Sequence, residues 1–185
     1  DVQDSLGCTE LDSLHVLQTS DLGTLSLPHL HSIGRDLILY GNTGLRQVSM
    51  PDLMDVGGQL SIEQNPALET VSMPQLMDVS GSLQIQDNSL LVTVSMPDLM
   101  DVSGSLQIQD NSLLVAAVFS QLHHIGQDLH VVQNGELFLV SMPQLMDVSG
   151  SLQIQNNPLL VTAVFSRLDH IGQDLRVVQN GSLQE

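Results

Sequence analysis

Apolar and polar positions follow one another along this chain in a pattern that repeats every 23 residues. A leucine column opens each repeat, and a column of Val, Leu or Ile follows two residues later. The first column is Leu14, Leu37, Leu60, Leu83, Leu106, Leu129, Leu152 and Leu175, and the second is Val16, Leu39, Ile62, Ile85, Ile108, Val131, Ile154 and Val177. No insertion or deletion interrupts the step, so the chain is an array of equivalent structural units.

The spacing within each repeat predicts strands. Apolar residues stand in Leu-x-Ile and Val-x-Met pairs, and no long stretch carries the i, i+3, i+4, i+7 stripe of a helix. Prolines follow the Met column and glycines precede the leading Leu, where they end strands and turn the chain. The prediction is therefore an all-β fold, a right-handed parallel β-helix or solenoid of about eight coils of 23 residues.

The repeat also sets the expected domain boundaries. Residues 1–10 are predicted to be an N-terminal lead-in or cap, and residues 11–185 a single solenoid domain. Because the chain stops partway through a coil, we expect the natural protein to continue beyond it. An unpaired strand edge at that end also predicts end-to-end self-association as an alternative.

A polar column occupies one position of every repeat. It is Thr19 in the first repeat and then Asn42, Asn65, Asn88, Asn111, Asn134, Asn157 and Asn180. A side-chain amide both donates and accepts, so it can pair backbone groups of its own coil and of the next one. We interpret this column as a structural Asn ladder; a binding role for these residues is the alternative.

Composition narrows the function classes. The chain is 42% apolar with no Trp, so Leu, Ile, Val and Met must fill the core. Four basic against 21 acidic residues give a net charge of −17, which excludes phosphate-directed nucleic acid binding and disfavours anionic membranes. No apolar run is long enough to insert into a membrane. Cys8 is the only cysteine, so no disulfide forms within the chain, and whether Cys8 pairs with a missing segment stays open.

The outward positions of the main strand form the candidate binding surface. Alternation in a strand places residues 84 and 86 on the same side, so equivalent residues stack into a flat amide-rich face. The candidate residues are Gln84, Gln86, Gln107, Gln109, His130, Gln153, Gln155 and Arg176. Ser82, Ser105 and Ser151 precede these positions and are expected to extend the face. Such a face can hold a glycan or a protein edge; the alternative is a solvated surface made uniform by repeat duplication.

Ionisable side chains also stand in columns. One column contains Asp55, Asp78, Asp101 and Asp147, with His124 and His170 at the missing steps, and Asp87 and Asp110 form a second pair. Calcium would relieve their repulsion, but one carboxylate per layer is a poor cage, so a solvated turn is favoured. His123 and His124 with His170 form a weak transition-metal candidate. We therefore predict no metal site and no cofactor.

The repeat resembles the receptor L-domain, the leucine-rich-repeat-like solenoid of insulin and epidermal growth factor receptors. In pattern it is most similar to repeats of fungal cell-wall proteins. Residues 60–83 carry the resemblance best, as Leu-Ser-Ile-Glu-Gln-Asn-Pro-Ala-Leu-Glu-Thr-Val-Ser-Met-Pro-Gln-Leu-Met-Asp-Val-Ser-Gly-Ser-Leu. The resemblance implies a secreted or surface-displayed module: receptor members bind protein ligands on a sheet face, and fungal members support the cell wall.

These observations together predict a non-catalytic extracellular or cell-surface structural and interaction module, with a protein or a glycan as partner. A ligand-binding receptor domain is the first alternative. A polysaccharide-active enzyme is a remote one, because basic partners for the acidic residues are nearly absent and nothing in the pattern converges on one cleft.

Overall fold

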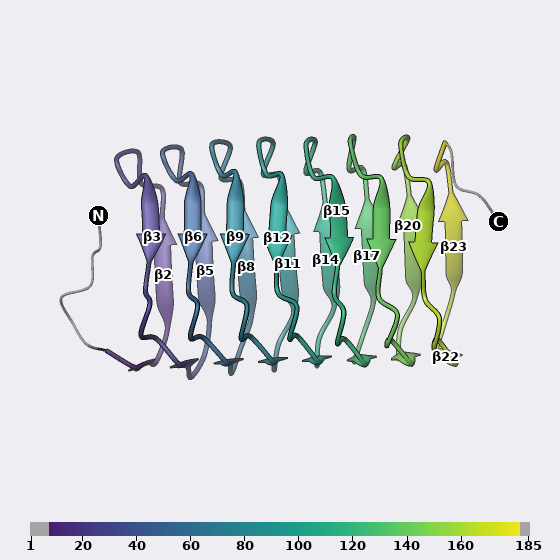
Figure 1. Cartoon of the computed structure of the whole chain (residues 1–185), viewed down its shortest axis with the longest axis horizontal. Helices are drawn as coiled ribbons and strands as arrows, with labels where there is room; N and C mark the ends of the chain where they lie inside the picture. The colour runs from purple at the N-terminus through teal and green to yellow at the C-terminus, as the bar shows by residue number, and fades with distance from the viewer. Residues whose placement is uncertain (1–7, 182–185) are drawn as a thin grey trace.

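The computed structural model describes residues 8–181, which contain strands and turns but no helix. The all-β parallel solenoid predicted from the repeat is confirmed, with seven complete coils between the first and last strands. Figure 1 shows the coils stacked side by side along one axis, with β2 (Leu14–Leu17) and β23 (Leu175–Val178) in coils at opposite ends of the stack. Residues 1–7 of the predicted N-terminal lead-in and residues 182–185 of the predicted solenoid domain lie outside the described residues.

Each coil contributes one strand to each of three faces. The first face is an eight-stranded sheet made of β2 (Leu14–Leu17), β5 (Leu37–Tyr40), β8 (Leu60–Glu63), β11 (Leu83–Gln86), β14 (Leu106–Gln109), β17 (Leu129–Val132), β20 (Leu152–Gln155) and β23 (Leu175–Val178). The second face contains β1 (Glu10–Leu11), β4 (Ser32–Ile33), β7 (Asp55–Val56), β10 (Asp78–Val79), β13 (Asp101–Val102), β16 (His124–Ile125), β19 (Asp147–Val148) and β22 (His170–Ile171). In all these sheets the paired strands are parallel and one coil apart, so the sequence period becomes the sheet register.

The third face is divided into two sheets. Four strands form the first, β3 (Thr24–Ser26), β6 (Gln47–Ser49), β9 (Thr70–Ser72) and β12 (Thr93–Ser95), and three form the second, β15 (Ala116–Val118), β18 (Leu139–Ser141) and β21 (Thr162–Val164). The break falls where a coil with Val94 and Met96 meets a coil with Ala117 and Phe119. The same change of side chains between β18 and β21 leaves those strands paired, so the substitutions alone do not cause the break.

Aliphatic side chains fill the interior in layers. The leading Leu and the residue two positions later are fully buried in every interior coil, as Leu106 and Ile108 illustrate at 0% and 1% exposure. Burying a Leu or Ile side chain contributes about 1.5–3 kcal/mol, but one coil buries its residues only against neighbouring coils. The last coil confirms this dependence, because Leu175 in β23 is 60% exposed.

The Asn column lies inside the solenoid, at the corner that follows the first face. Asn42, Asn65, Asn88, Asn111, Asn134 and Asn157 are each 0% exposed. Asn111 is representative: its Nδ2 donates to the Ile85 carbonyl at 2.9 Å, and its Oδ1 accepts from the backbone N–H of Asn88 at 3.2 Å. Each amide therefore joins its own coil to the preceding one through buried hydrogen bonds.

Left-handed backbone makes this corner. The residue before each ladder Asn has a positive φ, between 52° and 57° for the non-glycine residues. These residues are Gln18, Gln64, Asp87, Asp110, Gln133, Asn156 and Gln179, with Gly41 at the equivalent step. The reversal of φ turns the chain so that the following Asn enters the core. Positive φ costs an L-residue roughly 1 kcal/mol, and the amide hydrogen bonds offset that cost.

Close backbone approach explains a second corner. A Cβ built on Gly81 would lie 2.7 Å from the carbonyl carbon of Gly58 in the preceding coil. Glycine is required there because neighbouring coils touch through their main chains.

We expect Asn111→Leu to lower the free energy of unfolding by roughly 3 kcal/mol or more. The change leaves the Ile85 carbonyl and the Asn88 N–H without their amide partner, and each buried orphan costs about 1–3 kcal/mol. Urea unfolding measures the loss, with Gln121→Leu on the exposed surface as control. Equal stability of the two variants would show that the ladder does not hold the coils together.

Candidate functional site

The candidate residues of the main strand lie together on the outside of the first face. In β11 the burial alternates, with Leu83 and Ile85 inside and Gln84 and Gln86 outward. One outward column runs Ser61, Gln84, Gln107, His130, Gln153, Arg176, and the other runs Glu63, Gln86, Gln109, Val132, Gln155, Val178. The parallel register thus places all eight candidate residues in two adjacent rows.

Amide groups in these rows bond one another. Gln86 Nε2 donates to Gln107 Oε1 at 3.1 Å, and Gln84 Nε2 donates to the same oxygen at 3.5 Å. Gln109 Nε2 donates to Gln86 Oε1, and Gln155 Nε2 donates to Gln153 Oε1 at 2.9 Å. Each amide uses part of its hydrogen-bonding capacity within the row and keeps the remainder for solvent or a ligand.

The coil of β17 interrupts the amide rows. His130 stands between Gln107 and Gln153, and Val132 stands beside it between Gln109 and Gln155. The Nε2 atom of His130 is buried and has no hydrogen-bond partner. The face therefore divides into one amide block on β11 and β14 and another on β20.

The expectation that serines extend this face is wrong. Ser105 and Ser151 are 5% and 8% exposed, and their hydroxyl oxygens accept hydrogen bonds from the backbone N–H groups of the next coil. Ser82 does the same for Ser105, at 3.1 Å. In the same column Asp128 Oδ1 accepts from the Ser151 N–H at 2.7 Å. These side chains form a second ladder that caps the corner before each main strand, so the exposed face consists of amides rather than of serines.

The Asp column lies on the second face. Asp55, Asp78 and Asp101 occupy successive coils in register. Partial desolvation raises the pKa of Asp78 above its usual value, and the Asp101 and Asp55 carboxylates raise it further. At the Asn corner, partial desolvation and the neighbouring Asp87 raise the pKa of Asp110 in the same way. Repulsion between stacked carboxylates is therefore a measurable cost of this repeat.

The three histidines proposed as a metal candidate are not gathered. His124 stacks between Asp101 and Asp147, and its Nδ1 lies 2.9 Å from an Asp147 carboxylate oxygen. Asp147 in turn separates His124 from His170. Among residues 8–181, no group of three or more His, Cys, Asp or Glu side chains is arranged to hold a metal ion.

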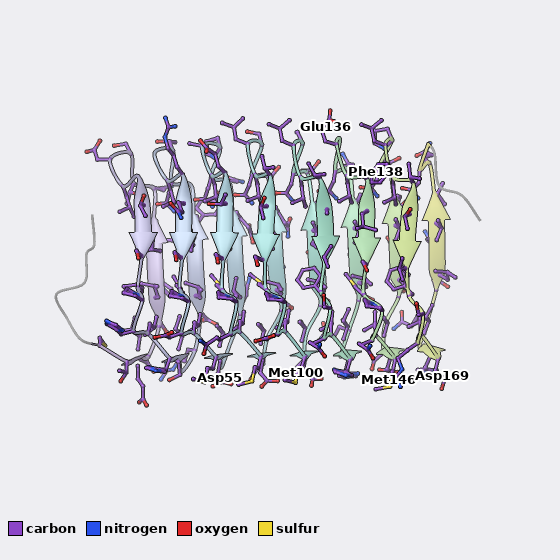
Figure 2. The ribbon with its side chains drawn as sticks, in the orientation of Figure 1. Asp55, Met100, Glu136, Phe138, Met146 and Asp169 are labelled. Carbon is purple, nitrogen blue, oxygen red and sulfur yellow. The ribbon has the colours of Figure 1, made fainter. Side chains whose placement is uncertain are left out.

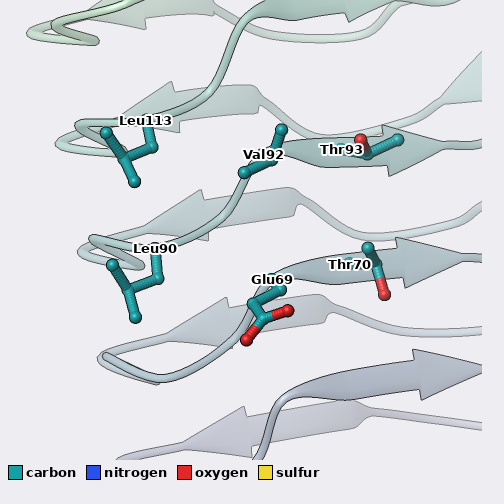
Figure 3. Close-up of a pocket in the computed structure, with 6 residues that line it drawn as sticks. All are labelled: Glu69, Thr70, Leu90, Val92, Thr93 and Leu113. Carbon is teal, nitrogen blue, oxygen red and sulfur yellow. The ribbon is translucent and has the colours of Figure 1, made fainter.

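An apolar groove that the sequence analysis did not predict lies where the third face changes sheets. It encloses about 410 Å³ and is lined by residues of three consecutive coils (Figure 3). Its lining residues are Glu69, Thr70, Leu90, Val92, Thr93 and Leu113. Glu69 at its rim is paired with Arg46 at 3.4 Å. The groove can accept an apolar side chain, and its only ionisable lining residue already has a partner.

Further exposed apolar residues continue along the same edge. Val115 is 48% exposed, Phe138 53% and Leu159 46% (Figure 2 labels Phe138). Leu90, Leu113 and Leu159 occupy one position of the 23-residue repeat, and Val92, Val115 and Phe138 occupy the position two residues later. Neither position belongs to the core columns. The sequence signal that could have predicted these exposed residues is an apolar side chain at a repeat position that does not face the core.

Comparison of the chain with protein-family models, with curated proteins and with solved structures yields no match. Within the described residues there is also no helix of the length and apolarity that crossing a membrane requires.

We expect Asp78→Asn to raise the free energy of unfolding at pH 7 by a few tenths to about 1 kcal/mol. Two unit charges about 5 Å apart repel by about 0.8 kcal/mol in water, and salt weakens the effect at this exposed site. Because the pKa of Asp78 is raised in the folded state, the folded wild type takes up the proton at a higher pH than the unfolded chain does. The wild type therefore gains stability relative to the variant as the pH falls toward 3.8. Urea unfolding between pH 7 and pH 4 tests both statements.

Asp98→Asn is the matched control, because the equivalent residues in the two adjacent coils are the neutral Gln75 and Gln121. It removes the same charge without relieving a stacked carboxylate. An equal gain from Asp98→Asn, or a gain from Asp78→Asn that persists unchanged in 0.5 M NaCl, would contradict the explanation.

Proposed function

We propose that this chain is a non-catalytic structural and interaction module that contacts a protein or a glycan through its first face. The observation that carries the proposal is the pair of outward rows in which Gln84, Gln86, Gln107 and Gln109 bond one another across coils. A flat surface of ordered amides is suited to recognising an extended polar ligand.

Order in the amide rows lowers the cost of binding. A free Gln side chain loses rotamer entropy when a ligand fixes it, about 0.5–1.5 kcal/mol for each immobilised side chain. Gln86 and Gln107 are already held by their mutual hydrogen bond, so part of that loss occurs on folding. Their remaining donors and acceptors repeat at the coil spacing of about 4.8 Å, which favours a ligand with its own regular polar groups.

Several observations argue against a polysaccharide-active enzyme. Such chemistry needs an acid and a base that converge on a cleft, with environments that separate their pKa values. The acidic residues instead recur one per coil, and the groove on the third face has Glu69 as its single carboxylate, paired with Arg46. The enzyme remains the remote alternative to the interaction module.

The more specific relationship, to the receptor L-domain and to fungal cell-wall repeats, rests on the repeat pattern. That pattern, with Asn, Leu, Val and Met-Pro at fixed spacing, supports an extracellular or cell-surface location as part of the proposal. A dedicated receptor domain differs from a structural module in binding one ligand with high affinity. The exposed apolar residues Val115 and Phe138 on the neighbouring edge favour a protein as the partner, because such patches mark interaction sites.

We expect the purified chain to bind a member of an arrayed set of glycans and secreted proteins, and Gln107→Arg with Gln153→Arg to weaken that binding at least tenfold. Arginine at these positions breaks the amide rows and adds bulk and charge to both blocks of the face. Biolayer interferometry on the strongest hit measures the change.

The control carries Gln75→Arg and Gln121→Arg, which add the same charge at exposed turns away from the first face. Equal weakening by both double variants would indicate a charge effect and reject the first face as the site. A screen without any hit would leave a passive spacer as the function of the repeat.

A further inference from the structure

A second methionine column lies on the surface of the solenoid. The buried column contains Met50, Met73, Met96 and Met142, each 0% exposed, and is part of the core. The outer column precedes the strands of the second face and runs Cys8, His31, Met54, Met77, Met100, His123, Met146, Asp169. Met100 is 38% exposed and Met146 is 44% exposed, so packing does not account for these thioethers.

The backbone places three soft ligands in consecutive coils. The His123 N–H donates to the Met100 carbonyl at 2.8 Å, and the Met146 N–H donates to the His123 carbonyl at 2.9 Å. Met100, His123 and Met146 therefore occupy successive layers about 4.8 Å apart, with the imidazole in the middle. Figure 2 shows Met100 and Met146 along the same edge of the molecule, with Asp169 beyond them.

We propose that Met100, His123 and Met146 form a binding site for a soft monovalent cation, Cu(I) or Ag(I). Thioether sulfur and imidazole nitrogen are the ligand types that select such ions, whereas calcium and magnesium require oxygen.

The geometry allows the three ligands to converge. The Cα atoms of Met100 and Met146 are two layers apart, roughly 9.6 Å. Two thioethers bound to one ion lie much closer together than that, so each sulfur must lean toward His123. Methionine has three rotatable side-chain bonds and makes such a movement without displacing the backbone.

The surroundings favour a cation and leave the imidazole free. Within the described residues the His123 side chain makes no hydrogen bond, whereas the neighbouring His124 is engaged by Asp147. Asp101, Asp147 and Asp169 lie in the same and adjacent coils, and the whole chain carries a net charge of −17. This negative field raises the local concentration of any cation, while the sulfur and nitrogen ligands provide selectivity for a soft one.

The test is titration of the chain with Ag(I) in chloride-free buffer, followed by calorimetry and by NMR of the Met methyl and His ring signals. Cys8→Ser with His31→Gln is the background for every sample, because the exposed Cys8 thiol and the His31 imidazole, which precedes Met54 in the same column, would themselves bind silver. We expect one Ag(I) per chain, with shifts of the Met100, His123 and Met146 signals. Met100→Leu with Met146→Leu should weaken binding at least tenfold, since Leu keeps the volume and removes both sulfurs.

Met54→Leu with Met77→Leu is the matched control, because it removes two thioethers from the same column without touching the coils beside His123. It should retain wild-type affinity. The proposal is overturned if this control loses as much affinity as the Met100/Met146 variant, if the latter binds like the wild type, or if no Ag(I) binds. Displacement of Ag(I) by a tenfold excess of Zn²⁺ would also overturn it, since that result would place the ion on His124 and the carboxylates.

Discussion

The fold depends on hydrogen bonding between consecutive coils, and the buried Asn ladder is its most demanding part. At this corner the chain leaves the first face through a residue with positive φ, so local backbone groups lose their strand partners. Asn111 supplies them, since its amide bonds the Ile85 carbonyl of the preceding coil and the Asn88 N–H. A buried polar group without a partner costs more than any single aliphatic contact contributes, so every interior coil needs an amide here.

Once this corner is fixed, the register of all three faces follows. Each paired strand meets its equivalent one coil away, and side chains of the same column therefore lie beside one another. For Leu and Ile this stacking builds a core, and for Gln it produces bonded rows. For Asp it produces partial desolvation and repulsion between carboxylates, which together raise the pKa of Asp78. Surface chemistry in a solenoid of this kind is a consequence of stacking, and a substitution in one coil changes the environment of both neighbours.

Departures from the repeat are where the molecule acquires distinct local chemistry. His123 replaces a methionine and becomes an imidazole between two thioethers. Phe138 replaces a smaller residue and extends an exposed apolar edge. His130 and Val132 divide the amide rows of the first face. A strict copy of the preceding coil would have left each of these surfaces uniform, so these substitutions contribute variety at positions that the core does not constrain.

The sequence alone determined the period, the strand positions and the identity of the core columns, because a strict repeat of alternating apolar residues has one compact solution. It also placed Gln84 and Gln86 on a common outward face, since alternation in a strand is local. The tertiary structure decided what lies beside what at the corners. Ser105 and Ser151 were expected on the face but bond the next coil, and the groove at Leu90 and Leu113 lies beside the point where two sheets separate. These features depend on the path of the backbone between strands, and that path is set by packing between coils rather than by the pattern within one.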